Sequence, residues 1–68
     1  AMGSNRQVDI SLARVFCLLA DVYFQEKRYS EAKERYANAL DLFRKRADKD
    51  GMAVAMQGIG NCNIEIRF

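Results

Sequence analysis

Residues 13–42 read ARVFCLLADVYFQEKRYSEAKERYANALDL, and they contain the clearest pattern in the chain. Apolar side chains recur in them at spacings of three and four, which places them on one face of a helix. The polar segment 26–30 interrupts this pattern, and Ser30 can accept hydrogen bonds from the first turn of a following helix. The stretch therefore predicts two helices joined by a short turn.

The same periodicity, extended in both directions, predicts helices over about 9–26, 31–50 and 52–66. Proline is absent, and Gly51 suits the left-handed residue that follows the end of a helix. Residues 64–68 alternate apolar and charged side chains, which also fits a strand, but no second strand is predicted to pair with it. We therefore expect an all-α fold.

Two further patterns bear on how these helices pack. Gly58 and Gly60 lie inside the third predicted helix, where each costs about 1 kcal/mol relative to alanine, so we interpret both as places of close packing. We expect Phe16, Leu19 and Tyr23 to belong to the core, since they share one stripe of the first helix.

Length and composition limit the class of protein. With 68 residues the chain forms a single domain, predicted over residues 5–68, while residues 1–4 resemble a remnant of recombinant expression. The formal net charge of +2 is nearly balanced, so no strong field draws the chain to nucleic acid. No apolar run approaches the roughly 18 residues that a membrane span needs. We expect a soluble protein with neither nucleic acid nor membrane as a partner.

The sequence offers no catalytic or metal-binding constellation. Histidine is absent, and Cys17 and Cys62 have no neighbouring base in the sequence that would make either one a nucleophile. Two cysteines so far apart do not form a metal site either. We therefore predict no enzyme activity, no metal and no cofactor. Two reduced thiols indicate an intracellular, cytoplasmic protein.

An internal repeat appears at a spacing of forty residues. The side chains of Ala13, Phe16, Leu19 and Ala20 are matched in order and approximate size by Ala53, Met56, Ile59 and Gly60. The repeating unit is thus one pair of helices, and the chain holds about one and a half units.

The first unit resembles the tetratricopeptide repeat family at Phe16, Leu19, Ala20, Tyr23, Ala32, Tyr36 and Ala39. The resemblance implies helix pairs stacked into a right-handed superhelix, here a helix-turn-helix followed by a third helix. The spacing of forty departs from the common 34 and is similar to a long-repeat variant of the family. Two residues also depart from the pattern, because Arg44 replaces the usual proline and Asn63 stands where the first unit has Tyr23.

The resemblance implies a non-catalytic scaffold or adaptor that binds a peptide or helix of a partner protein on a concave face. The matching positions are Arg14, Cys17, Asp21 and Phe24 in the first unit, and Val54, Gln57, Asn61 and Ile64 in the second. The amide of Asn61 can both donate to and accept from a peptide backbone, while an ordinary surface or helix-end asparagine is the other open interpretation. Arg14 and Asp21 share one helix face, which favours a mixed-charge peptide over a purely acidic one.

Self-association is the alternative function, because one and a half repeats cannot bury all of their apolar faces. Val15, Leu18 and Val22 lie on a face of the first helix that a preceding helix would cover, and Met56 and Ile59 lie on a third helix without its own partner. A homodimer or an exchange of helices would cover both faces. A dimer can still carry peptide grooves, so the two functions do not exclude each other.

Overall fold

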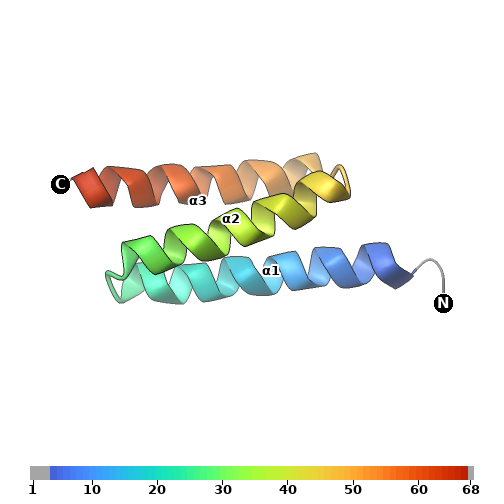
Figure 1. The fold of residues 1–68 in the computed structure, drawn as a ribbon, viewed down its shortest axis with the longest axis horizontal. Helices are drawn as coiled ribbons and strands as arrows, with labels where there is room; N and C mark the ends of the chain where they lie inside the picture. Colours follow the sequence, from blue (N-terminus) through green and yellow to red (C-terminus); the bar gives the residue numbers. More distant parts are fainter. Residues whose placement is uncertain (1–3, 68) are drawn as a thin grey trace.

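The computed structural model describes residues 4–67, with side chains described from residue 7. It contains three helices, α1 (Ser4–Gln25), α2 (Tyr29–Lys45) and α3 (Lys49–Arg67). α2 packs against both other helices, whereas α1 and α3 scarcely contact each other (Figure 1). The all-α prediction is confirmed, and residues 64–67 belong to α3, so the strand interpretation is wrong for them. Of the four residues assigned to recombinant expression, residues 1–3 lie outside the described residues.

The two turns between the helices have the same backbone geometry. In the first, Lys27 has a φ of 64°, and the amide of Arg28 donates to the carbonyl of Tyr23 at 2.8 Å. In the second, Ala47 has a φ of 56°, and the next amide donates to the carbonyl of Phe43 at 2.9 Å. Both helices thus end in a left-handed residue whose neighbours bond to the last turn, although neither residue is a glycine.

The second helix ends earlier than the sequence predicts. α2 stops at Lys45 rather than near residue 50, because the left-handed turn occurs at Ala47 and not at Gly51. The carboxylate of Asp48 then accepts a hydrogen bond from the amide of Gly51 at 3.3 Å, as an N-cap residue does. α3 therefore begins at Lys49, and Gly51 lies in its first turn.

Two other predicted helix starts also change. α1 begins at Ser4 instead of residue 9. α2 begins at Tyr29, and its N-cap position is Arg28, which makes no side-chain capping bond. The prediction that Ser30 caps this helix is therefore wrong, because Ser30 already lies within its first turn.

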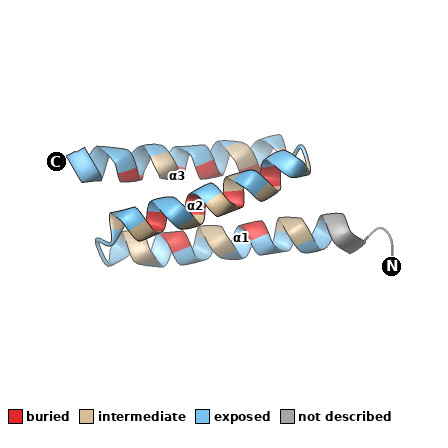
Figure 2. Cartoon of the chain, in the orientation of Figure 1, coloured by how far each residue is buried: buried red, intermediate tan, exposed pale blue. Residues whose placement is uncertain are grey.

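The core is made mainly of small side chains along the two lines where α2 meets its neighbours (Figure 2). The buried residues are Ala13, Ala20, Ala32, Tyr36, Ala39, Phe43, Gly51, Ala55, Gly58 and Cys62. Small residues let the helix axes approach closely, and the rings of Tyr36 and Phe43 fill the remaining space. Phe16 and Tyr23 are half-buried against this core, but Leu19 is 42% exposed, so its assignment to the core is wrong.

The two interior glycines of α3 behave differently. A Cβ atom on Gly58 would lie 2.5 Å from the ring of Tyr36, and one on Gly51 would overlap the ring of Phe43. Around Gly60, in contrast, such a Cβ would meet no packing neighbour within 4 Å beyond the adjoining backbone of its own helix. Close packing therefore explains Gly51 and Gly58, while the same interpretation of Gly60 is wrong.

Candidate functional site

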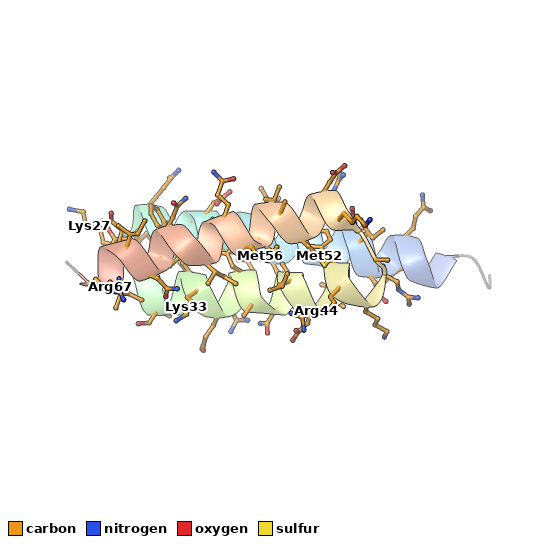
Figure 3. All side chains as sticks on the ribbon, turned by 90° about the horizontal axis from the view of Figure 1, so that it is seen from above. Lys27, Lys33, Arg44, Met52, Met56 and Arg67 are labelled. Carbon is orange, nitrogen blue, oxygen red and sulfur yellow. The ribbon has the colours of Figure 1, made fainter. Side chains whose placement is uncertain are left out.

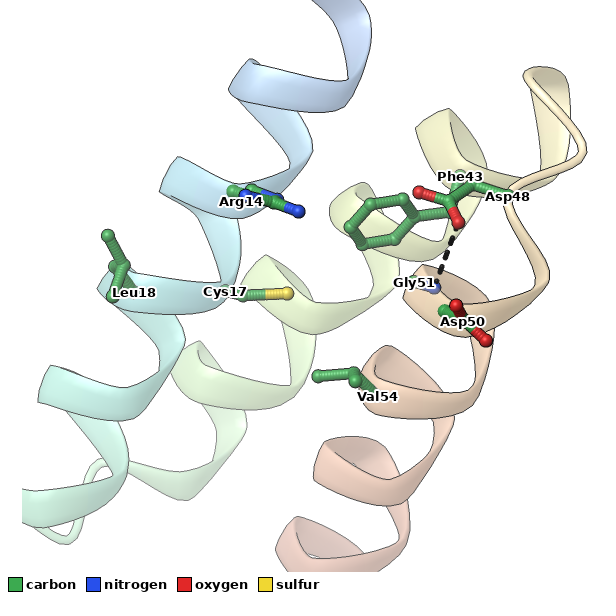
Figure 4. Close-up of a pocket in the computed structure, with 8 residues that line it drawn as sticks. All are labelled: Arg14, Cys17, Leu18, Phe43, Asp48, Asp50, Gly51 and Val54. Atoms are coloured by element: carbon green, nitrogen blue, oxygen red, sulfur yellow. Dashed lines mark hydrogen bonds between the residues drawn. The ribbon is translucent and has the colours of Figure 1, made fainter.

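A groove runs between α1 and α3, with α2 as its floor. Its larger pocket has a volume of about 420 Å³ (Figure 4). The pocket is lined by Arg14, Cys17 and Leu18 from α1, by Phe43 from α2, and by Asp48, Asp50, Gly51 and Val54 at the start of α3. The groove exists because α1 and α3 both pack on α2 but not on each other.

A second pocket of about 200 Å³ continues the groove toward the other end of the molecule. Its lining residues are Cys17, Asp21, Tyr36, Val54, Gln57, Gly58 and Asn61. Cys17 and Val54 line both pockets, so the two are consecutive parts of one depression, which we call the α1–α3 groove.

Most of the predicted peptide-binding residues lie in this groove. Arg14, Cys17 and Asp21 line it from α1, and Val54, Gln57 and Asn61 line it from α3. These six are brought together from positions up to 47 residues apart, since 61 minus 14 is 47. That they bind a peptide stays a prediction.

Two predicted residues are not among those that line the groove. Phe24 packs against the buried cluster around Ala20, and its ring meets that of Tyr29 edge-on at 5.1 Å. It thus supports the turn between α1 and α2. Ile64 is exposed in the last turns of α3, beyond the lining of either pocket.

Several groove residues were not predicted to be there. Leu18, which we assigned to self-association, lines the larger pocket, and Tyr36 and Phe43 form the floor. Asp48 and Asp50 were missed because the sequence placed them inside the second helix. The signal for them is an aspartate three residues before Gly51, which is the spacing of an N-cap.

The groove carries more negative than positive charge. Asp21, Asp48 and Asp50 contribute three carboxylates, against the single guanidinium of Arg14. Two of the three carboxylates have partners within the fold, since Asp21 accepts a hydrogen bond from the hydroxyl of Tyr36 and Asp48 caps α3.

The titratable groups beside Asp21 remain protonated at neutral pH. Burial and donation to Asp21 raise the pKa of Tyr36 well above its ordinary value. Burial, helped by the charge of Asp21, also raises the pKa of the Cys17 thiol. Because the thiolate is the reactive form, a raised pKa makes Cys17 a poor nucleophile.

The residues assigned to self-association lie on the outside of the bundle. Val15, Leu18 and Val22 are exposed on α1. Met56, which is labelled in Figure 3, is exposed on α3. Ile59 is partly covered by the core cluster that contains Cys62.

Within residues 4–67, the structure holds no group of three or more histidine, cysteine or acidic residues placed to bind a metal ion. Among the helices described, none combines the length and the apolar character required to cross a membrane.

The geometry agrees with a comparison against protein families. The family model described as tetratricopeptide repeat matches residues 11–67, which covers most of the chain. The chain belongs to the tetratricopeptide repeat family. Neither curated proteins nor solved structures give a match. Tetratricopeptide repeats are non-catalytic scaffolds that mediate protein–protein interactions, and in this chain the α1–α3 groove lies on the face formed by the first helices of successive repeats.

Proposed function

We propose that this tetratricopeptide repeat chain is an adaptor that holds an extended peptide segment of a partner protein in the α1–α3 groove. The observation that carries the proposal is the continuity of the two pockets, which share Cys17 and Val54. The side-chain amides of Gln57 and Asn61 favour an extended ligand over a helix, because the backbone groups of a helix are already hydrogen-bonded to one another.

The larger pocket indicates an apolar side chain in the ligand. Leu18, Phe43 and Val54 supply apolar surface in a cavity of about 420 Å³, enough for a large aliphatic or aromatic residue. Burying such a side chain contributes about 1.5–3 kcal/mol, which makes it the main anchor of a short peptide.

The charges of the groove indicate a basic residue next to that anchor. Asp50 lines the larger pocket and is exposed, whereas Asp21 and Asp48 already accept hydrogen bonds within the fold. A lysine or arginine of the ligand would pair with Asp50, and an acidic residue would pair with Arg14 across the pocket. A peptide that combines an apolar residue with a neighbouring basic one fits this arrangement best.

The two cysteines of the chain are both free, which suits a reducing compartment such as the cytoplasm. We place the adaptor there.

The test is a selection from random peptides displayed on phage, followed by fluorescence anisotropy with the enriched sequences. We expect them to contain an apolar residue beside lysine or arginine, and we expect the Asn61→Ala variant to bind them at least about fivefold more weakly, since a lost hydrogen bond costs about 1 kcal/mol. Bound peptide should also slow alkylation of Cys17, which lines both pockets, while fully buried Cys62 serves as an internal reference.

Asn63→Ala is the matched control for this test. Asn63 is also an exposed asparagine of α3, but it does not line either pocket. If both variants lose affinity equally, or if bound peptides leave the alkylation of Cys17 unchanged, the peptide binds elsewhere and the proposal is wrong.

Self-association is a second candidate function, which the exposure of large aliphatic side chains on α1 favours. Exposed apolar patches of this kind on soluble domains commonly mark interaction surfaces. Self-association through these side chains does not depend on peptide binding in the α1–α3 groove.

A further inference from the structure

The smaller pocket of the α1–α3 groove differs in character from the larger one. Its polar lining consists of the carboxylate of Asp21, the hydroxyl of Tyr36 and the side-chain amides of Gln57 and Asn61, around a volume of about 200 Å³. We propose that this pocket holds the ammonium group of a ligand lysine, two residues along the peptide from the apolar side chain in the larger pocket. This recognition rests on the proposed function, because it adds a second position to a peptide bound in the groove.

The carboxylate of Asp21 is available to a cation. Among the described residues that line the smaller pocket, Asp21 alone carries a charge. Tyr36 donates a hydrogen bond to Oδ1 of Asp21, but a neutral hydroxyl does not cancel the charge, and the lone pairs of Oδ2 remain for another donor. No lysine or arginine among the described side chains forms an ion pair with Asp21.

Arg14, which lines the larger pocket, lies too far along α1 to compensate Asp21. The two residues are seven positions apart, which is about 10 Å along the axis of a helix. This separation is comparable with the Debye length of about 8 Å at physiological ionic strength, so the attraction between these two exposed groups is largely screened. The smaller pocket therefore keeps a net negative charge.

The neutral groups of the smaller pocket suit an ammonium ion. The amides of Gln57 and Asn61 each carry a carbonyl oxygen, and together with Asp21 they offer an acceptor to each of the three hydrogens of a lysine ammonium. Arginine fits less well, because its planar fork binds a carboxylate best through both oxygens and Tyr36 already occupies one oxygen of Asp21.

The offset between the two pockets sets the spacing of two residues. The lining on α1 moves from residues 14–18 to residues 17–21, and the lining on α3 moves from residues 50–54 to residues 54–61. Both helices run in the same direction (Figure 1), so the centre of the lining shifts by about 5–8 Å along the groove. An extended peptide advances about 6.6 Å in two residues, and side chains two residues apart point to the same side.

Asp21 and Asp50 thus recognise different positions of the peptide. Asp50 lines only the larger pocket, where it faces the basic residue next to the apolar anchor, whereas Asp21 lines only the smaller pocket. The Asp50→Asn variant should therefore lose the preference for a basic residue beside the anchor and keep the preference for lysine two residues away.

The test repeats the selection of random peptides on phage with the native chain, Asp21→Asn and Asp41→Asn. Asparagine at position 21 retains an acceptor oxygen for the hydroxyl of Tyr36, so the fold is preserved. Asp41 is an exposed aspartate of α2 that lines neither pocket, which makes Asp41→Asn the matched control for the loss of one negative charge. We expect the native chain and Asp41→Asn to enrich lysine two residues from an apolar residue, and Asp21→Asn to enrich the apolar residue without the lysine.

Fluorescence anisotropy with an enriched peptide then measures the contact. Replacing its lysine by norleucine keeps the aliphatic chain and removes the ammonium group. We expect this replacement to weaken binding to the native chain about tenfold, as for the loss of a hydrogen bond to a charged group, and to change binding to Asp21→Asn by less than about twofold. Replacing the lysine by arginine should weaken binding to the native chain about threefold, since only one oxygen of Asp21 is open to the fork.

Three results would overturn the lysine pocket. Enrichment of lysine that survives in Asp21→Asn would place its contact elsewhere. Peptides that lack lysine at this spacing and still slow the alkylation of Cys17 would overturn the lysine pocket while the proposed function stands. A selection that enriches no peptide, or only peptides that leave the alkylation of Cys17 unchanged, would overturn both.

Discussion

α1 and α3 are equivalent helices of successive repeats, but each uses a different face to contact α2. In α1 the face with Ala13 and Ala20 is buried, and the face with Val15 and Val22 is exposed. In α3 the faces are reversed, since Ala53 and Gly60, the counterparts of Ala13 and Ala20, are exposed, and Ala55 and Cys62 are buried. A first helix of this repeat thus has two faces on which a neighbouring helix can pack. In this chain α2 covers one of these faces on α1 and the other on α3.

This difference indicates that the size of the side chains on a face, rather than their polarity, decides whether α2 packs against that face. The contact of α3 with α2 needs the absence of a side chain at Gly51 and Gly58, while the contact of α1 with α2 works with alanine. The exposed face of α1, in contrast, carries valine and leucine side chains. Substitutions that exchange these sizes test the comparison directly.

The largest effect is expected when Gly58 takes the side chain of its α1 counterpart, Leu18. The Gly58→Leu variant forces a branched side chain into the ring of Tyr36, and overpacking of this kind costs about 3 kcal/mol. Urea unfolding followed by circular dichroism should show a lower midpoint, or no folded baseline. If Gly58→Leu does not fold, Gly58→Ala gives the smaller loss of about 1–2 kcal/mol.

Gly60 provides the control for this prediction, because it lies in the same helix with open space around it. Gly60→Ala should raise the free energy of unfolding by about 0.5–1 kcal/mol through helix propensity alone. Equal losses at both glycines would contradict the packing argument.

The next largest effect is expected for Tyr36 of α2, because this residue contacts both α1 and α3. Its ring packs on Gly58 of α3, and its hydroxyl donates to Asp21 of α1. Tyr36→Phe keeps the ring and removes the donor, and losing a hydrogen bond to a charged group costs about 1.5–3 kcal/mol. Urea unfolding at neutral pH measures this loss.

The pH dependence of stability gives this prediction a second readout. The folded state raises the pKa of Tyr36 above its ordinary value of 10.0, so the stabilisation is complete below pH 10 and is lost as the pH rises further. The native chain should therefore lose stability more steeply above pH 10 than the Tyr36→Phe variant. Parallel curves for the two proteins would show that the hydroxyl of Tyr36 is not held by the fold.

Much of the architecture was predictable from the sequence, because the signals were local and periodic. The spacing of three and four found the three helices, and the resemblance to the tetratricopeptide repeat family placed Cys17 and Asp21 of α1 on the same face as Gln57 and Asn61 of α3. The exposure of Leu19 was not predictable, because periodicity identifies an apolar face but not whether a neighbour covers it.

The end of α2 was missed for a different reason. A glycine is the usual sign of a left-handed residue after a helix, so Gly51 was predicted to end the second helix. The fold instead places Ala47 in the left-handed region and uses Gly51 to admit the ring of Phe43. The competing signal, an N-cap at Asp48, was present in the sequence but weaker than glycine.

The smallest expected effect on stability concerns the turn at Ala47, which joins α2 to α3. Ala47 has a φ of 56°, a conformation that costs about 1 kcal/mol for a residue with a Cβ and little for glycine. Ala47→Gly should therefore raise the free energy of unfolding, partly offset by the greater entropy of glycine in the unfolded chain. Ala37→Gly, at an exposed position inside α2, is the matched control and should lower it by about 1 kcal/mol. Opposite signs for the two alanines in thermal unfolding would locate the strain in the turn, and a loss of stability in both would mean that the turn tolerates Ala47 without strain.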